Sequence, residues 1–215
     1  LHTQRRRQRQ MCIRDSWKKM KRVEIIYGGA SNEKEISYLT AKSIYEYIDT
    51  DLYNPGLTDL SKFDPDNFDN ETIFFIAVHG EGGEDGKIQT LLENKKRKFT
   101  GSSSESCILT WDKVATKRAL IANDILTPQF KSIKNNEHFD FNDSFFAEND
   151  HYFLKPNFNG SSYGISKVSD KKFNEALKEA KNYSTEVIIE KSLNGPEYTV
   201  ALLKGKPLTP LQILH

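Results

Sequence analysis

The sequence predicts an α/β domain built on an open parallel sheet, followed by an α+β domain. In the first half, short apolar runs that indicate buried strands, at residues 23–27 and 72–78, alternate with segments of helical spacing. This alternation is typical of a parallel sheet with helices on its faces. After Thr127-Pro128 the alternation stops, and short strands separated by turn residues predict hairpins instead. We therefore expect the domain boundary within residues 111–128.

The first apolar strand ends at Gly28-Gly29, a pair that permits a tight loop. Asn32 is expected to cap the helix that follows. Apolar residues close to helical spacing are expected to form the buried face of this helix. They are Ile36, Leu39, Ile44, Tyr47 and Ile48.

A second glycine-rich loop, residues 79–86, follows the strand at 72–78. Next comes a predicted helix with Ile88, Leu91 and Leu92 inward, and another helix is predicted over residues 112–123. Ligands in open α/β sheets bind at the carboxyl ends of the strands. Loops 28–32 and 79–86 are both expected at that edge.

The second half begins with a polar stretch, residues 132–150, that is rich in Asn and Asp. Strands are predicted at residues 151–155, 165–168, 185–190, 197–203 and around 211–213. A helix is predicted over residues 170–183, with Phe173, Leu177 and Ala180 facing inward.

Composition excludes several classes of protein. The 215 residues suffice for one or two cores, and no stretch reaches the roughly 20 apolar residues of a membrane span. Residues 1–22 hold nine Lys or Arg and one acidic residue, which leaves about −7 on the rest of a chain whose net charge is +1. A mildly acidic body does not indicate a nucleic-acid partner. Cys12 and Cys107 have no metal or redox spacing, so a reducing cytoplasm is expected.

Residues 1–19 differ from the rest of the chain. They show no helical or strand period, and no hydrophobic run precedes a small-residue cleavage site, so they are not a signal peptide. We interpret them as a non-native extension upstream of Met20. The alternative is a basic arm for nucleic acid or anionic lipid, and binding that depends on residues 1–19 would distinguish the two.

The loop at residues 155–164 is the strongest candidate for phosphate binding. Its glycines let backbone N–H groups point at an anion, its serines add hydroxyl donors, and Lys155 adds charge. It lacks the spacing of a Walker loop. Taken alone, a hairpin turn explains the same residues.

Several single residues also allow two interpretations. Glu190 and Glu197 flank a strand–turn–strand and could bind an adenine amino group and ribose hydroxyls, or be exposed carboxylates at strand ends. Glu33 could hold an ammonium group or favour the helix dipole. His79 could be structural, and Lys113 a surface lysine.

Together these segments resemble the D-alanine–D-alanine ligases, which are ATP-grasp enzymes. The resemblance is carried by six blocks in family order. They are residues 27–37; His79-Gly80 with residues 83–86, Gln89 and 91–93; residues 100–102; Asp112-Lys113; Lys155-Pro156 with residues 160–168; and Glu190-Lys191 with residues 195–200. The sequence departs from the family at Thr90 and at residues 103–106, where the family has smaller residues.

The resemblance implies an organisation: residues 20–111 as the pre-ATP-grasp substrate domain and residues 112–215 as a partial ATP-grasp domain. It also implies roles. The residues implied to bind ATP are Lys113, Lys155, Ser161, Ser162, Gly164, Glu190 and Glu197. Among these, Glu190 would accept from the adenine amino group and Glu197 from the ribose. Glu33 and His79 would position the first D-alanine, with Ser161 orienting Glu33.

The implied function is a step of peptidoglycan synthesis in the cytoplasm. ATP phosphorylates one D-alanine, and a second D-alanine attacks the acyl phosphate, with Mg²⁺ or Mn²⁺ assisting in a homodimer. The alternatives are a ligase whose second substrate is D-lactate or D-serine, and a nucleotide-binding module without catalysis. No membrane or nucleic-acid partner is implied.

The family sequence continues beyond the last block for roughly 100 residues, a domain-sized segment that carries its metal ligands. None of those ligands has a counterpart here, so no metal-binding residue is expected in this chain. Because the metal offsets phosphate charge in this chemistry, we expect this polypeptide alone not to ligate D-alanine. The measurement is phosphate release with ATP, Mg²⁺ and D-alanine; release above a blank without enzyme contradicts the expectation.

Overall fold

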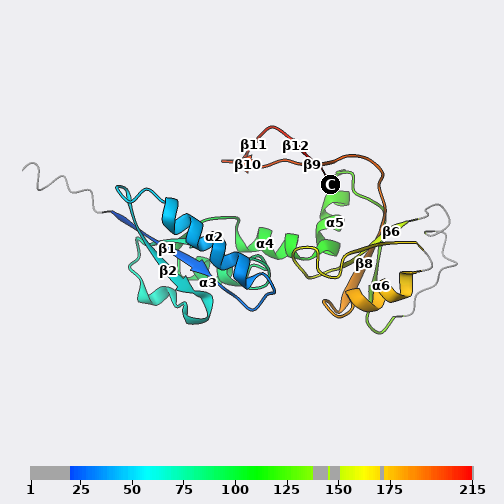
Figure 1. The fold of residues 1–215 in the computed structure, drawn as a ribbon, viewed down its shortest axis with the longest axis horizontal. Helices are drawn as coiled ribbons and strands as arrows, with labels where there is room; N and C mark the ends of the chain where they lie inside the picture. The colour runs from blue at the N-terminus through cyan, green and yellow to red at the C-terminus, as the bar shows by residue number, and fades with distance from the viewer. Residues whose placement is uncertain (1–19, 138–144, 146–150, 170–171, 215) are drawn as a thin grey trace, which may run out of the picture. The chain divides into compact units, whose positions relative to one another are not determined.

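The computed structural model describes residues 20–137, 145, 151–169 and 172–214, which form two compact units (Figure 1). The first unit holds the described residues up to Thr116 together with Asn159–Ser161. The second holds those of Lys117–Phe158 and those from Ser162 onward. The prediction for residues 1–19 lies outside the described residues.

The first unit is built on a four-stranded sheet in the order β2-β1-β3-β4, and every pair of neighbouring strands is parallel. The strands are β1 (Lys21–Tyr27), β2 (Tyr53–Asp59), β3 (Ile73–Ile76) and β4 (Lys98–Phe99). This confirms the open parallel sheet. The central strand β1 is buried on both faces, as parallel strands with covered faces are, which explains its nearly continuous apolar sequence.

Helices cover both faces of this sheet. Helix α2 (Lys34–Tyr47) packs on the face that presents Val23 and Ile25, where Ala41 and Ala77 complete a buried cluster. The opposite face presents Ile26 and Phe74, and helix α3 (Lys87–Asn94) packs there with the 3₁₀ turns η1 (Leu60–Lys62) and η2 (Pro65–Asn67). Helix α4 (Ser104–Trp111) follows, an element that the sequence did not predict.

The buried face of α2 differs from the prediction. Ile36, Leu39 and Tyr47 are 55%, 53% and 85% exposed, whereas Ser37 and Ala41 are fully buried. Small side chains at these two positions allow the helix to approach the sheet closely. The prediction followed the large apolar residues and therefore chose the wrong face. Ile44 and Ile48 do pack against the buried cluster, as expected. The N-cap is Glu33 rather than Asn32.

The second unit is built on an antiparallel sheet in the order β5-β8-β6-β7. Its strands are β5 (Phe130–Lys134), β6 (Tyr152–Pro156), β7 (Ser166–Val168) and β8 (Glu186–Lys191). Helix α6 (Phe173–Ala180) covers one face and buries Phe173, Leu177 and Ala180, as predicted. Strand β5 falls within a stretch for which no strand was predicted.

Two short antiparallel pairs complete the chain. Strands β9 (Glu197–Thr199) and β12 (Leu211–Ile213) form one, and β10 (Leu202–Leu203) and β11 (Lys206–Pro207) form the other. The strand predicted at residues 197–203 is thus two strands. Helix α5 (Lys113–Ala122) precedes β5. No helix in the described part of the chain is long and apolar enough to cross a membrane.

Ser37 links α2 to the ends of two strands of the parallel sheet. Its Oγ donates to the carbonyl oxygen of Ala77 at 2.8 Å and accepts from the amide nitrogen of Gly28 at 2.8 Å. Both contacts are buried, so each group depends on this hydroxyl for its hydrogen bond. The serine therefore fixes where β1 and β3 end.

Replacing Ser37 by alanine leaves a buried amide and a buried carbonyl without that partner. We expect Ser37→Ala to lower the free energy of unfolding of the first unit by about 1–3 kcal/mol. Native-state hydrogen exchange of the β1 and β3 amides measures this unit separately from the second. The control is Ser43→Ala, on the exposed side of the same helix, which should change it by less than about 0.5 kcal/mol. Equal effects would contradict the role of Ser37.

Candidate functional site

Two loops meet at the carboxyl edge of the parallel sheet, as the sequence predicted. The Oγ of Ser31, in the loop after β1, donates to the carbonyl oxygen of His79, in the loop after β3, at 2.8 Å. The ring of His79 lies between Thr40 and Glu84: Nε2 is 3.0 Å from the Thr40 hydroxyl, and Nδ1 is 3.7 Å from a Glu84 carboxylate oxygen. Polar groups from both loops and from α2 therefore gather at one edge.

Glu33 belongs to the same cluster. Its side chain makes no capping hydrogen bond to α2 and is half-buried. Two glycine backbones lie against it, because a methyl group added to Gly80 or Gly160 would be 2.9 or 3.1 Å from Glu33 Oε2. The cluster thus places the Glu33 carboxylate next to the loop that carries His79, and a carboxylate can bind an ammonium group.

Two other predicted site residues belong to the first unit. Lys113, the first residue of α5, donates from Nζ to the carbonyl oxygen of Asn159 at 2.6 Å. Ser161 is exposed and has a left-handed backbone conformation, with φ of 56°. Gly160, the residue before Ser161, lies directly against Glu33.

In the second unit, the strand register places one row of side chains across the sheet. Phe130 of β5 and Phe153 of β6 are both opposite Glu190 of β8, and Lys167 of β7 is opposite Phe153. Successive residues of a strand point to opposite faces. Since Tyr152 and Leu154 pack in the core with α6, this row lies on the other face.

Glu190 is buried on that face between two lysines. Lys117 of α5 lies 2.6 Å from Oε1, and Lys155 of β6 pairs with Oε2. The side chains of Lys117, Glu190 and Lys155 are 5%, 11% and 28% exposed. Lys155 reaches Glu190 because the two residues are diagonal neighbours across the β6–β8 pair. The simpler expectation, an exposed carboxylate, is wrong for Glu190.

The two phenylalanines contribute to the same arrangement. Nζ of Lys117 lies 5.1 Å from the centre of the Phe130 ring, and Nζ of Lys155 lies 5.5 Å from that of Phe153. Each lysine thus sits over the ring that stands opposite Glu190, at a distance where ring faces attract cations. The group is an ion triad of one carboxylate and two ammonium groups, with a net charge of +1.

The surroundings of Glu190 act on its ionisation in opposite directions. Burial alone raises the pKa of the carboxyl, but hydrogen bonds and charge from Lys117 and Lys155 outweigh it, so the pKa lies below its usual value. The carboxylate is therefore ionised at neutral pH. It can accept from a donor, while the excess positive charge favours an anion nearby.

Lys117 is the residue of this site that sequence reasoning missed. Lys113 stood in a recognisable block, and Lys117 follows it by one helical turn. The available signal was its spacing from Val114, a buried residue three positions earlier on the same helix. A lysine on the buried side of a helix requires a partner.

The remaining predicted nucleotide residues lie elsewhere in the second unit. Ser162 and Gly164 line a hollow of about 550 Å³ against α6, with Ala176 and Tyr183. The lining residues of that hollow do not include Lys155 or Glu190. Glu197, on β9, is exposed. The structure thus pairs Lys155 with Glu190, and it places Glu33 close to Gly80, the residue that follows His79.

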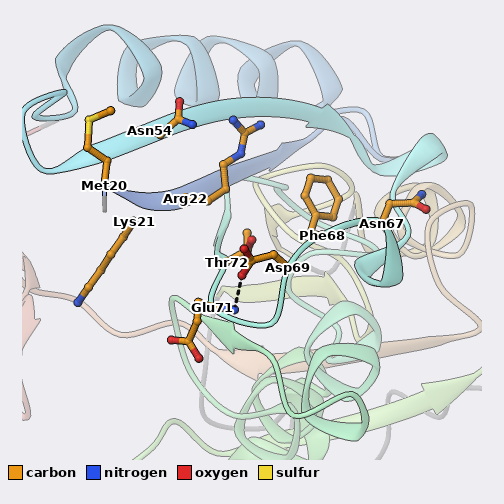
Figure 2. Close-up of a pocket in the computed structure, with 9 residues that line it drawn as sticks. All are labelled: Met20, Lys21, Arg22, Asn54, Asn67, Phe68, Asp69, Glu71 and Thr72. Carbon is orange, nitrogen blue, oxygen red and sulfur yellow. Dashed lines mark hydrogen bonds between the residues drawn. The ribbon is translucent and has the colours of Figure 1, made fainter. Parts of the chain in front are cut away.

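A different hollow, of about 640 Å³, lies at the opposite end of the parallel sheet (Figure 2). It is lined by Met20, Lys21, Arg22, Asn54, Asn67, Phe68, Asp69, Glu71 and Thr72. These residues lie at the amino-terminal ends of β1, β2 and β3, away from the edge where open α/β sheets bind ligands. We therefore do not assign the functional site to it.

Among the described residues, no group of three or more His, Cys, Asp or Glu side chains is arranged to hold a metal ion. The side chains described here thus do not form a metal site by themselves.

Known proteins resemble this chain in sequence. Residues 122–214 match the family model described as D-ala D-ala ligase C-terminus. A D-alanine–D-alanine ligase of Marinomonas sp. is 34% identical over 202 residues, covering 88% of this chain and 62% of that protein. One of Methylacidiphilum infernorum is 34% identical over 194 residues, covering 89% and 61%.

Solved structures give the same result. The D-alanine–D-alanine ligase of Bacillus anthracis, crystallised with ATP, superposes with a TM-score of 0.81 at 28% identity, covering 91% of this chain and 66% of that one. The chain therefore has the ATP-grasp fold of these ligases, with one parallel sheet and antiparallel sheets. More narrowly, the chain matches the D-alanine–D-alanine ligases, over residues 122–214 by the family model and over 88% of its length by a relative. It spans about three-fifths of the length of the curated relatives it matches.

Proposed function

We propose that this chain is part of an enzyme that joins two D-alanines to D-alanyl-D-alanine at the expense of ATP. The γ-phosphoryl group of ATP is transferred to the carboxylate of one D-alanine. The amine of a second D-alanine attacks the resulting acyl phosphate and releases phosphate. The observation that carries this proposal is the pairing of Lys155 with buried Glu190, in a chain that matches these ligases over both units.

The second unit is proposed as the nucleotide-binding part. Glu190 accepts a hydrogen bond from the adenine amino group, and Lys155 binds phosphate. Lys113, Ser161, Ser162, Gly164 and Glu197 complete the site, with Glu197 on the ribose. The support for these roles is the charge of the lysines, which offsets phosphate charge, and a buried ionised carboxylate that can distinguish a donor from an acceptor.

The first unit is proposed as the part that binds the first D-alanine. Glu33 takes the ammonium group, His79 positions the substrate, and Ser161 helps to orient Glu33. Support comes from the polar cluster at the carboxyl edge of the sheet, where Glu33 lies close to Gly80. Closure of the loop at residues 160–164 would exclude water from the acyl phosphate.

In terms of sequence, we propose that residues 20–111 form a substrate domain and that residues 112–215 belong to an ATP-grasp domain. The family likeness also supports a cytoplasmic homodimer in which a divalent cation, Mg²⁺ or Mn²⁺, neutralises phosphate charge. ATP and D-alanine are the proposed small-molecule partners. Peptidoglycan synthesis is the process that uses the product.

Binding of ATP tests the nucleotide half of the proposal. Titration calorimetry of the chain with ATP should give saturable binding, and Lys155→Met should weaken it by about ten- to hundredfold, because a hydrogen bond to a charged group is lost. Lys178→Met, on the exposed side of α6, is the matched control and should leave the affinity unchanged. No binding by the unsubstituted chain, or equal losses in both variants, would contradict the proposal.

Binding of D-alanine tests the substrate half. D-alanine, but not L-alanine, should shift the amide resonances of Glu33 and His79 in the NMR spectrum of the chain with ATP. Glu33→Gln should weaken D-alanine by at least about tenfold through loss of the charge that faces the ammonium group. Glu35→Gln changes an exposed carboxylate two residues away and should have no effect. A response that is the same for both enantiomers would rule out this pocket as the D-alanine site.

A further inference from the structure

The ammonium group of Lys117 makes three contacts within the protein. Nζ lies 2.6 Å from Glu190 Oε1, donates to the Thr127 hydroxyl at 2.7 Å, and lies 5.1 Å from the centre of the Phe130 ring. A lysine ammonium has three protons to donate. Two of these protons are directed to the oxygen atoms of Glu190 and Thr127, and the third points toward the ring of Phe130. The side chain is therefore fixed in one position.

Lys155 is bound differently. Its contacts in the described part of the chain are Glu190 Oε2 and the ring of Phe153, and more than a quarter of its side chain is exposed. A partly exposed lysine with one ionic partner can exchange that partner more easily than a buried one, because water reaches its ammonium group and replaces the lost contact. The two lysines that hold Glu190 are therefore not equivalent.

The proposed function requires this difference. If Lys155 binds phosphate and Glu190 accepts from adenine, the pair seen here must open when nucleotide binds. A carboxylate left without a cation between two phenylalanine rings would take up a proton, because burial disfavours its charged form. A protonated carboxyl presents an O–H group and no longer selects an amino group.

We propose that Lys117 is a positioning residue of the nucleotide site: a permanent buried counter-ion that keeps Glu190 ionised and aimed at the base when Lys155 turns to the phosphates. This inference rests on the proposed function for the role of Glu190. The assignment of Lys117 as the counter-ion of Glu190 depends only on geometry, namely the contacts of Lys117 to Glu190, Thr127 and Phe130.

The groups that face the Glu190 carboxylate define its pH dependence. The charges that act on it most are Lys117 from α5 and Lys155 from β6. On the same face β5 presents Phe130, and Lys167 of β7 lies with Nζ 5.8 Å from the centre of the Phe153 ring. Since the folded pKa lies below the unfolded value, the stabilisation is present above about pH 4.3 and is lost as pH falls through the folded pKa. Removing a lysine should move this loss to higher pH.

The first measurement is the titration of the Glu190 carboxyl carbon by NMR in three forms of the chain. Lys117→Met should raise the midpoint by about one pH unit or more. Lys155→Met should raise it less, because the buried lysine remains. Lys117→Arg, which keeps the charge, should restore the midpoint toward that of the unsubstituted chain. An equal or larger rise in Lys155→Met would overturn the proposal.

A double-mutant cycle keeps the test decisive if Lys117→Met does not fold. Glu190→Gln removes the charge that Lys117 holds, so Lys117→Met should cost far less stability in that background than in the unsubstituted chain. Folding of the double variant, where the single variant is unfolded, supports the counter-ion. If Lys117→Met is as harmful in both backgrounds, Lys117 acts through packing against Thr127 and Phe130, and the proposal fails.

The second measurement is base selectivity, which a purely structural role would not change. Inosine triphosphate carries a carbonyl oxygen where ATP carries the amino group. The unsubstituted chain should prefer ATP by at least about tenfold near neutral pH. Lys117→Met should lose this preference at a pH about one unit higher than the unsubstituted chain does.

The outcomes distinguish a failure of the role of Lys117 from a failure of the proposed function. A uniform loss of affinity for both nucleotides, with the pH dependence of selectivity unchanged, overturns the role of Lys117 in positioning. If neither nucleotide binds to the unsubstituted chain, the proposed function fails, while the carboxyl titration and the cycle still decide whether Lys117 is the counter-ion of Glu190.

Discussion

A carboxylate buried in the middle of a sheet face must be paired, and much of the second unit can be understood from that requirement. Glu190 stands between Phe130 and Phe153 because the strand register places one ring on each side. Such a position has little water to stabilise a charge. The register of β6 brings one lysine diagonally within reach, and α5 supplies the other. The face opposite α6 therefore carries a buried ion group that is flanked by two phenylalanine rings.

The two units place their polar side chains differently, because one sheet is parallel and the other is antiparallel. The parallel sheet of the first unit is covered on both faces, so only its carboxyl edge is left for polar groups. Glu33 and His79 lie there. The antiparallel sheet of the second unit is covered by α6 on one face, and the ion group of Glu190, Lys117 and Lys155 lies on the other. Under the proposed function, the first arrangement would serve an amino acid and the second a nucleotide.

The sequence predicted the parallel sheet and most elements because apolar runs and glycine loops report burial and turns directly. It missed the buried face of α2, because Ser37 and Ala41 are small and the larger Ile36 and Leu39 dominate the pattern, yet point outward. The pairing of Lys155 with Glu190 depends on strand register across 35 residues, which no local pattern contains. Glu33 and His79 were identified by the resemblance and by their place at strand ends, rather than by their own chemistry.

Lys117 shows why a buried ion group supports function better than it supports stability. Taking two ammonium groups and a carboxylate out of water costs energy that their attraction only partly returns, and apolar residues of similar volume are often as stable. Ile133 and Val187 show that the unit buries apolar side chains readily. A charge at Lys117 is thus not needed to fill space. It is useful if the carboxylate beside it must stay ionised while its other partner leaves, which is the situation that nucleotide binding would create.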